Sequence, residues 1–228
     1  YLALATEHAE AIHRSMLTEA ASGAGLAAQH RGDHAGAAAH YLELAGRAAT
    51  RKHRAQLTAR AAEAVHAGAV AAGDASARAR ALSLLDDADA LVADDPALAA
   101  GLTVLRASLA TRWPYTTHDD YRELLPQVQA AAIAMRHTAL SADTPEARRA
   151  HADAHATTAI ELACHIAFIT GRADQVAAMV DFAAATPALR AIGPSLLVGP
   201  PPVTPGLDDA HDIASRRFGV RERAFGQS

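Results

Sequence analysis

Histidines are the first candidates for chemistry in this sequence. His151 and His155 are one helical turn apart, so both would project from one helix face as metal ligands do. His165 lies almost three turns further on, roughly 15 Å along a helix axis and too far away to join them. Glu161 and His165 have the spacing of an acid–base pair on one face. Because no glutamate adjoins His151 and no third ligand is evident, we expect a solvated or interhelical histidine face, with metal binding as the alternative.

Two acidic runs, at 86–89 and 94–95, contain carboxylates of the kind that hold Mg²⁺. A prenyl-diphosphate enzyme would need facing carboxylates and an aromatic-lined pocket, but aromatic residues make up only 4% of the chain. Both runs lie where a helix is expected to end or begin, so we interpret them as helix-end residues. Histidines 30, 34 and 40 are interpreted as capping and turn surface, since 30 and 34 flank a turn and share no helical face.

Arg47, Arg51 and Arg54, with Lys52 and His53 between them, form the one basic cluster in the sequence. We expect this cluster at a helix C-terminus, where positive charge is favourable. A patch that binds phosphate or an acidic partner is the alternative.

Trp113 and Tyr115 stand in a predicted loop, where we expect them to fill a joint between repeats, with ligand stacking as the alternative. Cys164 adjoins His165, but neighbouring positions on a helix point about 100° apart and do not form a nucleophile–base pair. A buried structural cysteine is therefore expected. The sequence predicts no catalytic residue and no cofactor.

The elements that position these residues are predicted to be helices throughout. Half of the 228 residues are hydrophobic, and most of these are alanine, the strongest helix former. Apolar spacing and punctuation by Gly, Asp and Pro predict helices at 2–21, up to 30, 33–51, 55–72, 75–93, 96–112, 118–139, 144–170, 175–185 and 208–218. Pro126 is expected to kink or split its helix.

A Gly-Asp turn between helices recurs along the chain. It occurs at 32–33 and 73–74 and again, with two residues inserted, at 171–174. Glycine reaches left-handed backbone angles after a helix, and aspartate caps the next one. Recurrence of a two-helix unit roughly every forty residues indicates a solenoid, in which each pair packs on its neighbours. The stretch 193–206, rich in Pro and Gly, is predicted to be a loop or linker.

The run from position 13 to 49 resembles a pattern in large bacterial regulators, the STAND-type NTPases of the LuxR and MalT kind and related cyclase- or SARP-linked proteins. In these, a helix beginning "LHR" is followed by "LA-H" and then by "GD", spaced alanines and "YL". The matching residues here are His13, Arg14, Leu26, Ala27, His30, Gly32, Asp33, Ala37, Ala38, Tyr41, Leu42, Ala45 and Ala48.

The resemblance implies a tetratricopeptide-like arm, a right-handed superhelical array of antiparallel helix pairs with about ten helices. Residues 1–192 would form the array, and 207–228 would continue it. It also implies a sensor that binds a protein or small effector on its concave face and signals to NTPase and DNA-binding modules elsewhere in a longer chain. The alternative is a stand-alone helical metal- or ligand-binding protein or enzyme that uses the helix carrying His151 and His165.

Charge and hydropathy bear on which classes of protein function remain open. The formal net charge of −4 offers no footprint for direct nucleic-acid binding, and no run of 18 apolar residues predicts a membrane span. The single cysteine and the lack of a signal peptide favour a cytoplasmic protein. Because the sequence starts at Tyr1 rather than Met, we expect a fragment of a longer polypeptide.

Overall fold

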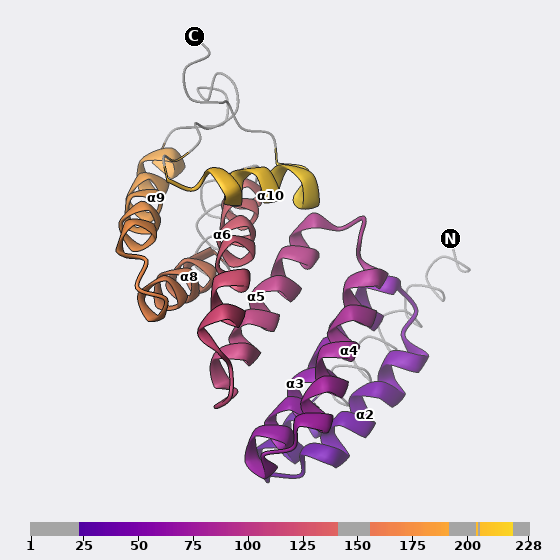
Figure 1. The fold of residues 1–228 in the computed structure, drawn as a ribbon. Helices are drawn as coiled ribbons and strands as arrows, with labels where there is room; N and C mark the ends of the chain where they lie inside the picture. Colours follow the sequence, from indigo (N-terminus) through magenta and orange to yellow (C-terminus); the bar gives the residue numbers. More distant parts are fainter. Residues whose placement is uncertain (1–22, 141–155, 192–203, 205, 221–228) are drawn as a thin grey trace, which may run out of the picture. The chain divides into compact units, whose positions relative to one another are not determined.

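The computed structural model describes residues 23–140, 156–191, 204 and 206–220. Every regular element in these ranges is a helix, which confirms the predicted all-α class (Figure 1). Contacts between Cα atoms group the chain into two compact units, residues 1–92 and 93–228. Each unit has its own cluster of buried side chains.

The first unit contains a helical segment at 23–30 followed by α2 (His34–Arg47), α3 (Arg51–Ala72) and α4 (Ala75–Leu91). Both α2 and α4 pack against α3, so helices that are neighbours in the sequence are also neighbours in space. Alanine supplies most of the core, and Tyr41 and Leu57 are its largest members. Small side chains allow helix axes to approach closely, which suits this alanine-rich sequence. The helical segment at 23–30 agrees with the helix predicted to end at residue 30.

The predicted Gly-Asp turns of this unit are confirmed. Gly32 and Gly73 have φ angles of 79° and 66°, a region that side chains with a Cβ rarely adopt. The carboxylate of Asp33 accepts a hydrogen bond from the backbone N–H of Gly36 at 2.9 Å. Asp74 accepts one from the N–H of Ser76 at 2.8 Å. Each aspartate thus satisfies a free donor at the start of a helix.

The boundary between α2 and α3 differs from the prediction. We expected one helix to continue to about residue 51 and the next to begin at 55, whereas α2 ends at Arg47 and α3 begins at Arg51. The Thr50 hydroxyl caps α3 by accepting a hydrogen bond from the N–H of His53 at 3.1 Å. Arg51 and Arg54 therefore lie in the first turn of a helix, and their expected place at a helix C-terminus is wrong. The cap and the burial of the α3 core face outweigh the unfavourable positive charge at that end.

The second unit is built around α6 (His118–Leu140). Helices α5 (Pro96–Arg112), α8 (Thr157–Ile169) and α10 (Asp208–Phe218) all pack against α6, and α9 (Ala173–Ala191) packs mainly against α8. Figure 1 shows α10 lying across α6 and α5, so the last described helix contacts elements much earlier in the chain. The core includes fully buried Val128, Ile133, Ile166, Met179 and Phe182.

Several boundaries in this unit match the sequence prediction. Helices α5 and α10 have the predicted limits, and Asp95 caps α5 through the N–H of Leu98 at 3.0 Å. Helix α6 runs through Pro126 without being split, because packing of α5, α8 and α10 along its length offsets the missing backbone donor. Helix α9 extends beyond the predicted 175–185 at both ends. Positions 144–155 of the predicted 144–170 helix, and most of the 193–206 segment, lie outside the described residues.

Candidate functional site

The predicted histidine site is only partly within the described residues. His151 and His155 lie outside them, while Glu161 and His165 are exposed on α8. Within the described ranges, no group of three or more His, Cys, Asp or Glu side chains is arranged to hold a metal ion. Cys164 is half-buried, and this burial, followed by the negative charge of Glu161, raises the pKa of its thiol.

Trp113 and Tyr115 contact each other but differ in exposure. Their rings meet edge-to-face with centroids 5.5 Å apart. The Trp113 side chain is buried, whereas Tyr115 is 69% exposed. The buried tryptophan follows the last residue of α5, and the Ala110 carbonyl accepts hydrogen bonds from both the Trp113 N–H and the Thr116 hydroxyl. This position suits packing for Trp113 and leaves Tyr115 accessible.

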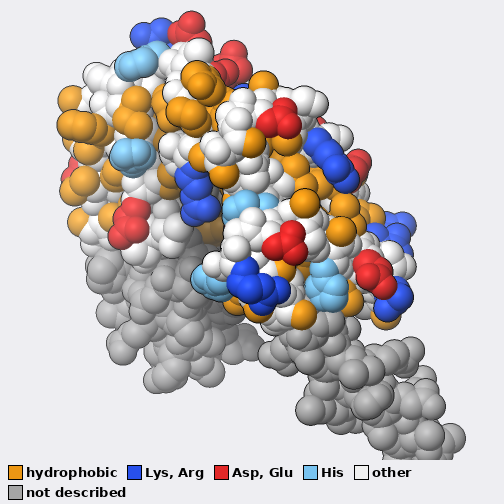
Figure 2. Space-filling model, turned by 90° about the horizontal axis from the view of Figure 1, so that it is seen from below, with side chains coloured by type: hydrophobic (Ala, Val, Ile, Leu, Met, Phe, Trp, Pro, Cys, Tyr) orange, Lys and Arg blue, Asp and Glu red, His pale blue; other side chains and the backbone are white. Residues whose placement is uncertain are grey.

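The predicted basic and acidic sets are distributed over exposed helix surface. Arg47 pairs with Glu43 one turn earlier at 2.6 Å, and Arg51 and Arg54 are exposed. Asp86 and Asp87 are exposed near the end of α4. Among the described side chains on the face in Figure 2, acidic and basic groups are interspersed with apolar ones. No described helix is both long enough and apolar enough to cross a bilayer.

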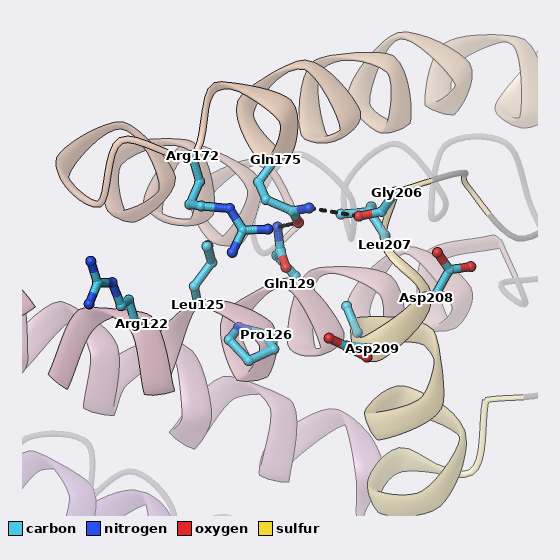
Figure 3. Close-up of a pocket in the computed structure, with 11 residues that line it drawn as sticks. Arg122, Leu125, Pro126, Gln129, Arg172, Gln175, Gly206, Leu207, Asp208 and Asp209 are labelled. Atoms are coloured by element: carbon cyan, nitrogen blue, oxygen red, sulfur yellow. Dashed lines mark hydrogen bonds between the residues drawn. The ribbon is translucent and has the colours of Figure 1, made fainter. Parts of the chain in front are cut away.

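A polar cleft in the second unit was not predicted from the sequence (Figure 3). Its volume is about 410 Å³, which is within the range of small-molecule sites. Three segments form it: the first half of α6, the turn that opens α9 and the start of α10. The lining residues are Arg122, Leu125, Pro126, Gln129, Arg172, Gln175, Gly206, Leu207, Asp208, Asp209 and Ala210.

Two glutamine amides connect the walls of this cleft. The Gln175 side-chain N–H groups donate to the Gly206 carbonyl at 2.9 Å and to the Asp174 carboxylate at 3.1 Å. Both partners are acceptors only, so the orientation of the Gln175 amide is fixed. Its Oε1 accepts a hydrogen bond from Nε2 of Gln129 at 3.0 Å. The chain of amides therefore ties α6 to α9 and to the residue before α10.

An arginine paired with an aspartate lies at the edge of the cleft. Arg172 donates from Nε and from Nη2 to the two carboxylate oxygens of Asp174, both at 3.2 Å. The hydrogen bond and charge of Asp174 raise the pKa of Arg172, and the charge of Asp209 raises it further. Hydrogen bonds from Arg172 and then from Gln175 lower the pKa of Asp174 to about 2. These two contacts orient the half-exposed guanidinium, and within the described residues its Nη1 makes no hydrogen bond.

The remaining charged residues lie at the rim and at the start of α10. Arg122 is exposed and donates to Asp119 at 2.9 Å. Figure 3 shows the Asp209 carboxylate on the side of Pro126, below the two glutamines. Within the described residues, Asp209 makes no hydrogen bond or ion pair. The cleft can thus offer donors from Arg172 and acceptors from Asp209 to one small ligand.

The first unit contains a second, less polar hollow of about 360 Å³. Alanines of α2, α3 and α4 line most of it, with His34, Gly68, Asp74 and Arg80 among the others. A Cβ at Gly68 would lie 3.2 Å from Cβ of His34, so the glycine permits the close approach of α2 and α3. Asp74 is occupied as the cap of α4. This hollow offers fewer convergent polar groups than the cleft of the second unit.

Sequence reasoning missed the cleft because its residues are far apart in the chain. Gln129 and Gln175 are 46 positions apart, and Gln175 is 31 positions from Gly206. The one local signal was Gln129 itself, a buried polar residue at 3% exposure in an alanine-rich helix. Comparison of the chain with family models, with curated proteins and with solved structures gives no match.

Proposed function

We propose that this chain is a helical interaction and sensor module that binds a small polar effector in the cleft of its second unit. The observation that supports this proposal most strongly is the position of the polar side chains in the second unit. Polar side chains from α6, the start of α9 and the start of α10 converge on a cavity of about 410 Å³. Convergent polar groups that line a concave site can fix the orientation of a bound ligand and make its binding specific.

The proposed mechanism is a shift between conformational states. A ligand that contacts α6, α9 and α10 together would stabilise the arrangement in which α10 packs on α6. The size of the population change depends on how much more tightly the ligand binds that state than the alternative state. Segments attached to α10 would then respond to the effector.

The larger context of the module is part of the same proposal. We propose that it belongs to a STAND- or LuxR-type bacterial regulator, in which attached NTPase and DNA-binding modules receive the signal. The in-order packing of α2, α3 and α4 is consistent with a tetratricopeptide-like array in the first unit. In the second unit, the contact of α10 with α5 and α6 adds packing between helices that are not neighbours in sequence.

A thermal-shift screen tests the proposed function. The full chain is heated with a panel of small anions, cations, neutral polar compounds and zwitterions. A ligand present at a hundred times its Kd stabilises the folded state by about 2.7 kcal/mol, so at least one compound should raise the Tm. The shift should decrease in Arg172→Ala and persist unchanged in Arg60→Ala, which removes an exposed arginine pair in the first unit. If no compound raises the Tm, the proposal is wrong.

A further inference from the structure

The chemistry of the cleft restricts the ligand beyond its size, and this step rests on the proposed function. The starting point is Gln129, whose side chain is buried at 3% exposure. Its Nε2 donates to Gln175, and that direction is imposed by the acceptor-only partners of Gln175. The Gln129 oxygen therefore points away from Gln175, as Figure 3 shows. Within the described residues no donor reaches this oxygen, so an acceptor on a largely buried side chain is accessible from the cleft.

A second acceptor of the cleft is negatively charged. The Asp209 carboxylate lies near Pro126, on the side to which the Gln129 oxygen points (Figure 3). A negative charge at this position is favourable because Asp209 lies in the first turn of α10, at the positive end of the helix dipole. The carboxylate is exposed and forms no ion pair with a described side chain, although the charge of Arg172 interacts with it across the cleft. One ammonium group with several N–H donors would satisfy both acceptors at once.

The opposite side of the cleft presents donors. Arg172 uses Nε and Nη2 for Asp174, and no hydrogen bond from its Nη1 is present among the described residues. Because the contacts with Asp174 use Nε and Nη2, Nη1 remains available to donate to an anionic oxygen. Asp174 thus acts as a positioning residue for Arg172. The field of Asp209 reaches Arg172, so the two charges bound the same small space.

We infer that the cleft binds a small zwitterion of the α-amino acid class. Its ammonium group lies between the Asp209 carboxylate and the Gln129 oxygen, and its carboxylate accepts from Nη1 of Arg172. The ammonium end contributes most of the specificity, since Arg172 already has a carboxylate partner and Asp209 has none within the described residues. The cavity of about 410 Å³ leaves room for a side chain of moderate size.

Isothermal titration calorimetry of the full chain with the twenty L-α-amino acids tests this inference. At least one should bind, and the N-acetylated form of the best binder should show no heat of binding. The decarboxylated amine should bind more weakly, since it loses the Arg172 contact alone. Asp209→Asn should weaken binding by about 10-fold to 100-fold, as expected for loss of a charged hydrogen bond. Asp212→Asn is the matched control, an exposed aspartate of α10 outside the cleft, and should bind as the wild type does.

The outcomes separate this inference from the proposed function. If an anion or a neutral compound stabilises the chain through Arg172 while no amino acid binds, the effector site stands and the zwitterion assignment is wrong. Equal binding of the N-acetylated form, or an unchanged affinity in Asp209→Asn, also overturns the assignment. If no compound of any class binds, both proposals fail. Circular dichroism of Asp209→Asn verifies that a lost affinity does not reflect unfolding.

Discussion

The protonation of an individual side chain depends on its burial and on the charges of its immediate neighbours, and Cys164 illustrates both. The thiol is half-buried in α8 and packs against the core of the second unit. Desolvation disfavours its thiolate, and the charge of Glu161 one turn earlier adds to the effect, so its pKa is raised. A protonated thiol is a poor nucleophile, which agrees with a structural role.

Alkylation of Cys164 by iodoacetamide should therefore be slow at pH 7 and should accelerate at higher pH than alkylation of N-acetylcysteine. Glu161→Gln removes one of the two causes and should move the midpoint of the pH–rate curve towards lower pH. A wild-type midpoint equal to that of N-acetylcysteine would contradict the described environment. The chain has one cysteine, so the rate reports on this side chain alone.

Asp174 should make the stability of the second unit depend on pH in a narrow window. Hydrogen bonds from Arg172 and then Gln175 lower its pKa from 3.8 to about 2. A lowered pKa means that the charged form is favoured by folding, so the contribution is complete above about pH 4. It is lost as pH falls through about 2. The Tm difference between wild type and Asp174→Asn should be constant near neutral pH and should shrink between pH 4 and 2. Because the group is exposed, the difference should be small, and a growing difference in acid would be inconsistent with this pairing.

At the scale of helices, caps and turn glycines determined which boundaries could be predicted. The turns at Gly32 and Gly73 were predictable because a left-handed glycine followed by a capping aspartate is a local signal. The start of α3 was not, because the cap of Thr50 is followed by positive charges that normally disfavour a helix N-terminus. Likewise, the sequence pattern around Pro126 predicted a kink or a split, but it contains no information on the helices that pack against α6. In the structure α6 continues through this proline.

Close helix packing in the first unit depends on Gly25. A Cβ added there would lie 2.7 Å from Cζ of Tyr41, whose ring is buried at 2% exposure. Gly25→Ala should reduce the free energy of unfolding by about 1–2 kcal/mol, since overpacking outweighs the better helix propensity of alanine. Gly46→Ala is the matched control, as its Cβ would meet nothing within 4 Å, and it should leave stability equal or higher. Urea denaturation measures both variants, and equal effects would contradict the packing of Tyr41 on this segment.

At the scale of the whole molecule, the chain divides into two units that the sequence pattern did not separate. The periodicity of apolar residues is the same on both sides of Val92, so a single array was predicted for 1–192. The cleft was invisible for a related reason: helical periodicity identifies the buried face of each helix but not which helices meet. The contact of α10 with α6 joins segments separated by most of the second unit.

The division predicts that residues 93–228 fold on their own. Their core is built entirely from side chains of that unit, including Ile133, Ile166 and Phe182. The purified fragment should show a helical circular dichroism spectrum and one cooperative thermal transition. It should also retain the effector response of the full chain, because every residue that lines the cleft lies in it. A fragment that unfolds without cooperativity would show that the second unit needs the first.

Nuclear magnetic resonance of the side-chain amides tests the central claim, the effector cleft, most directly. The full chain is titrated with the compound that gives the largest thermal shift. The account predicts that the amide signals of Gln129 and Gln175 move in proportion to occupancy, while that of Gln56, exposed on α3 of the first unit, stays in place. Movement of the Gln56 signal with no change at Gln129 and Gln175 would place the ligand elsewhere and contradict the account.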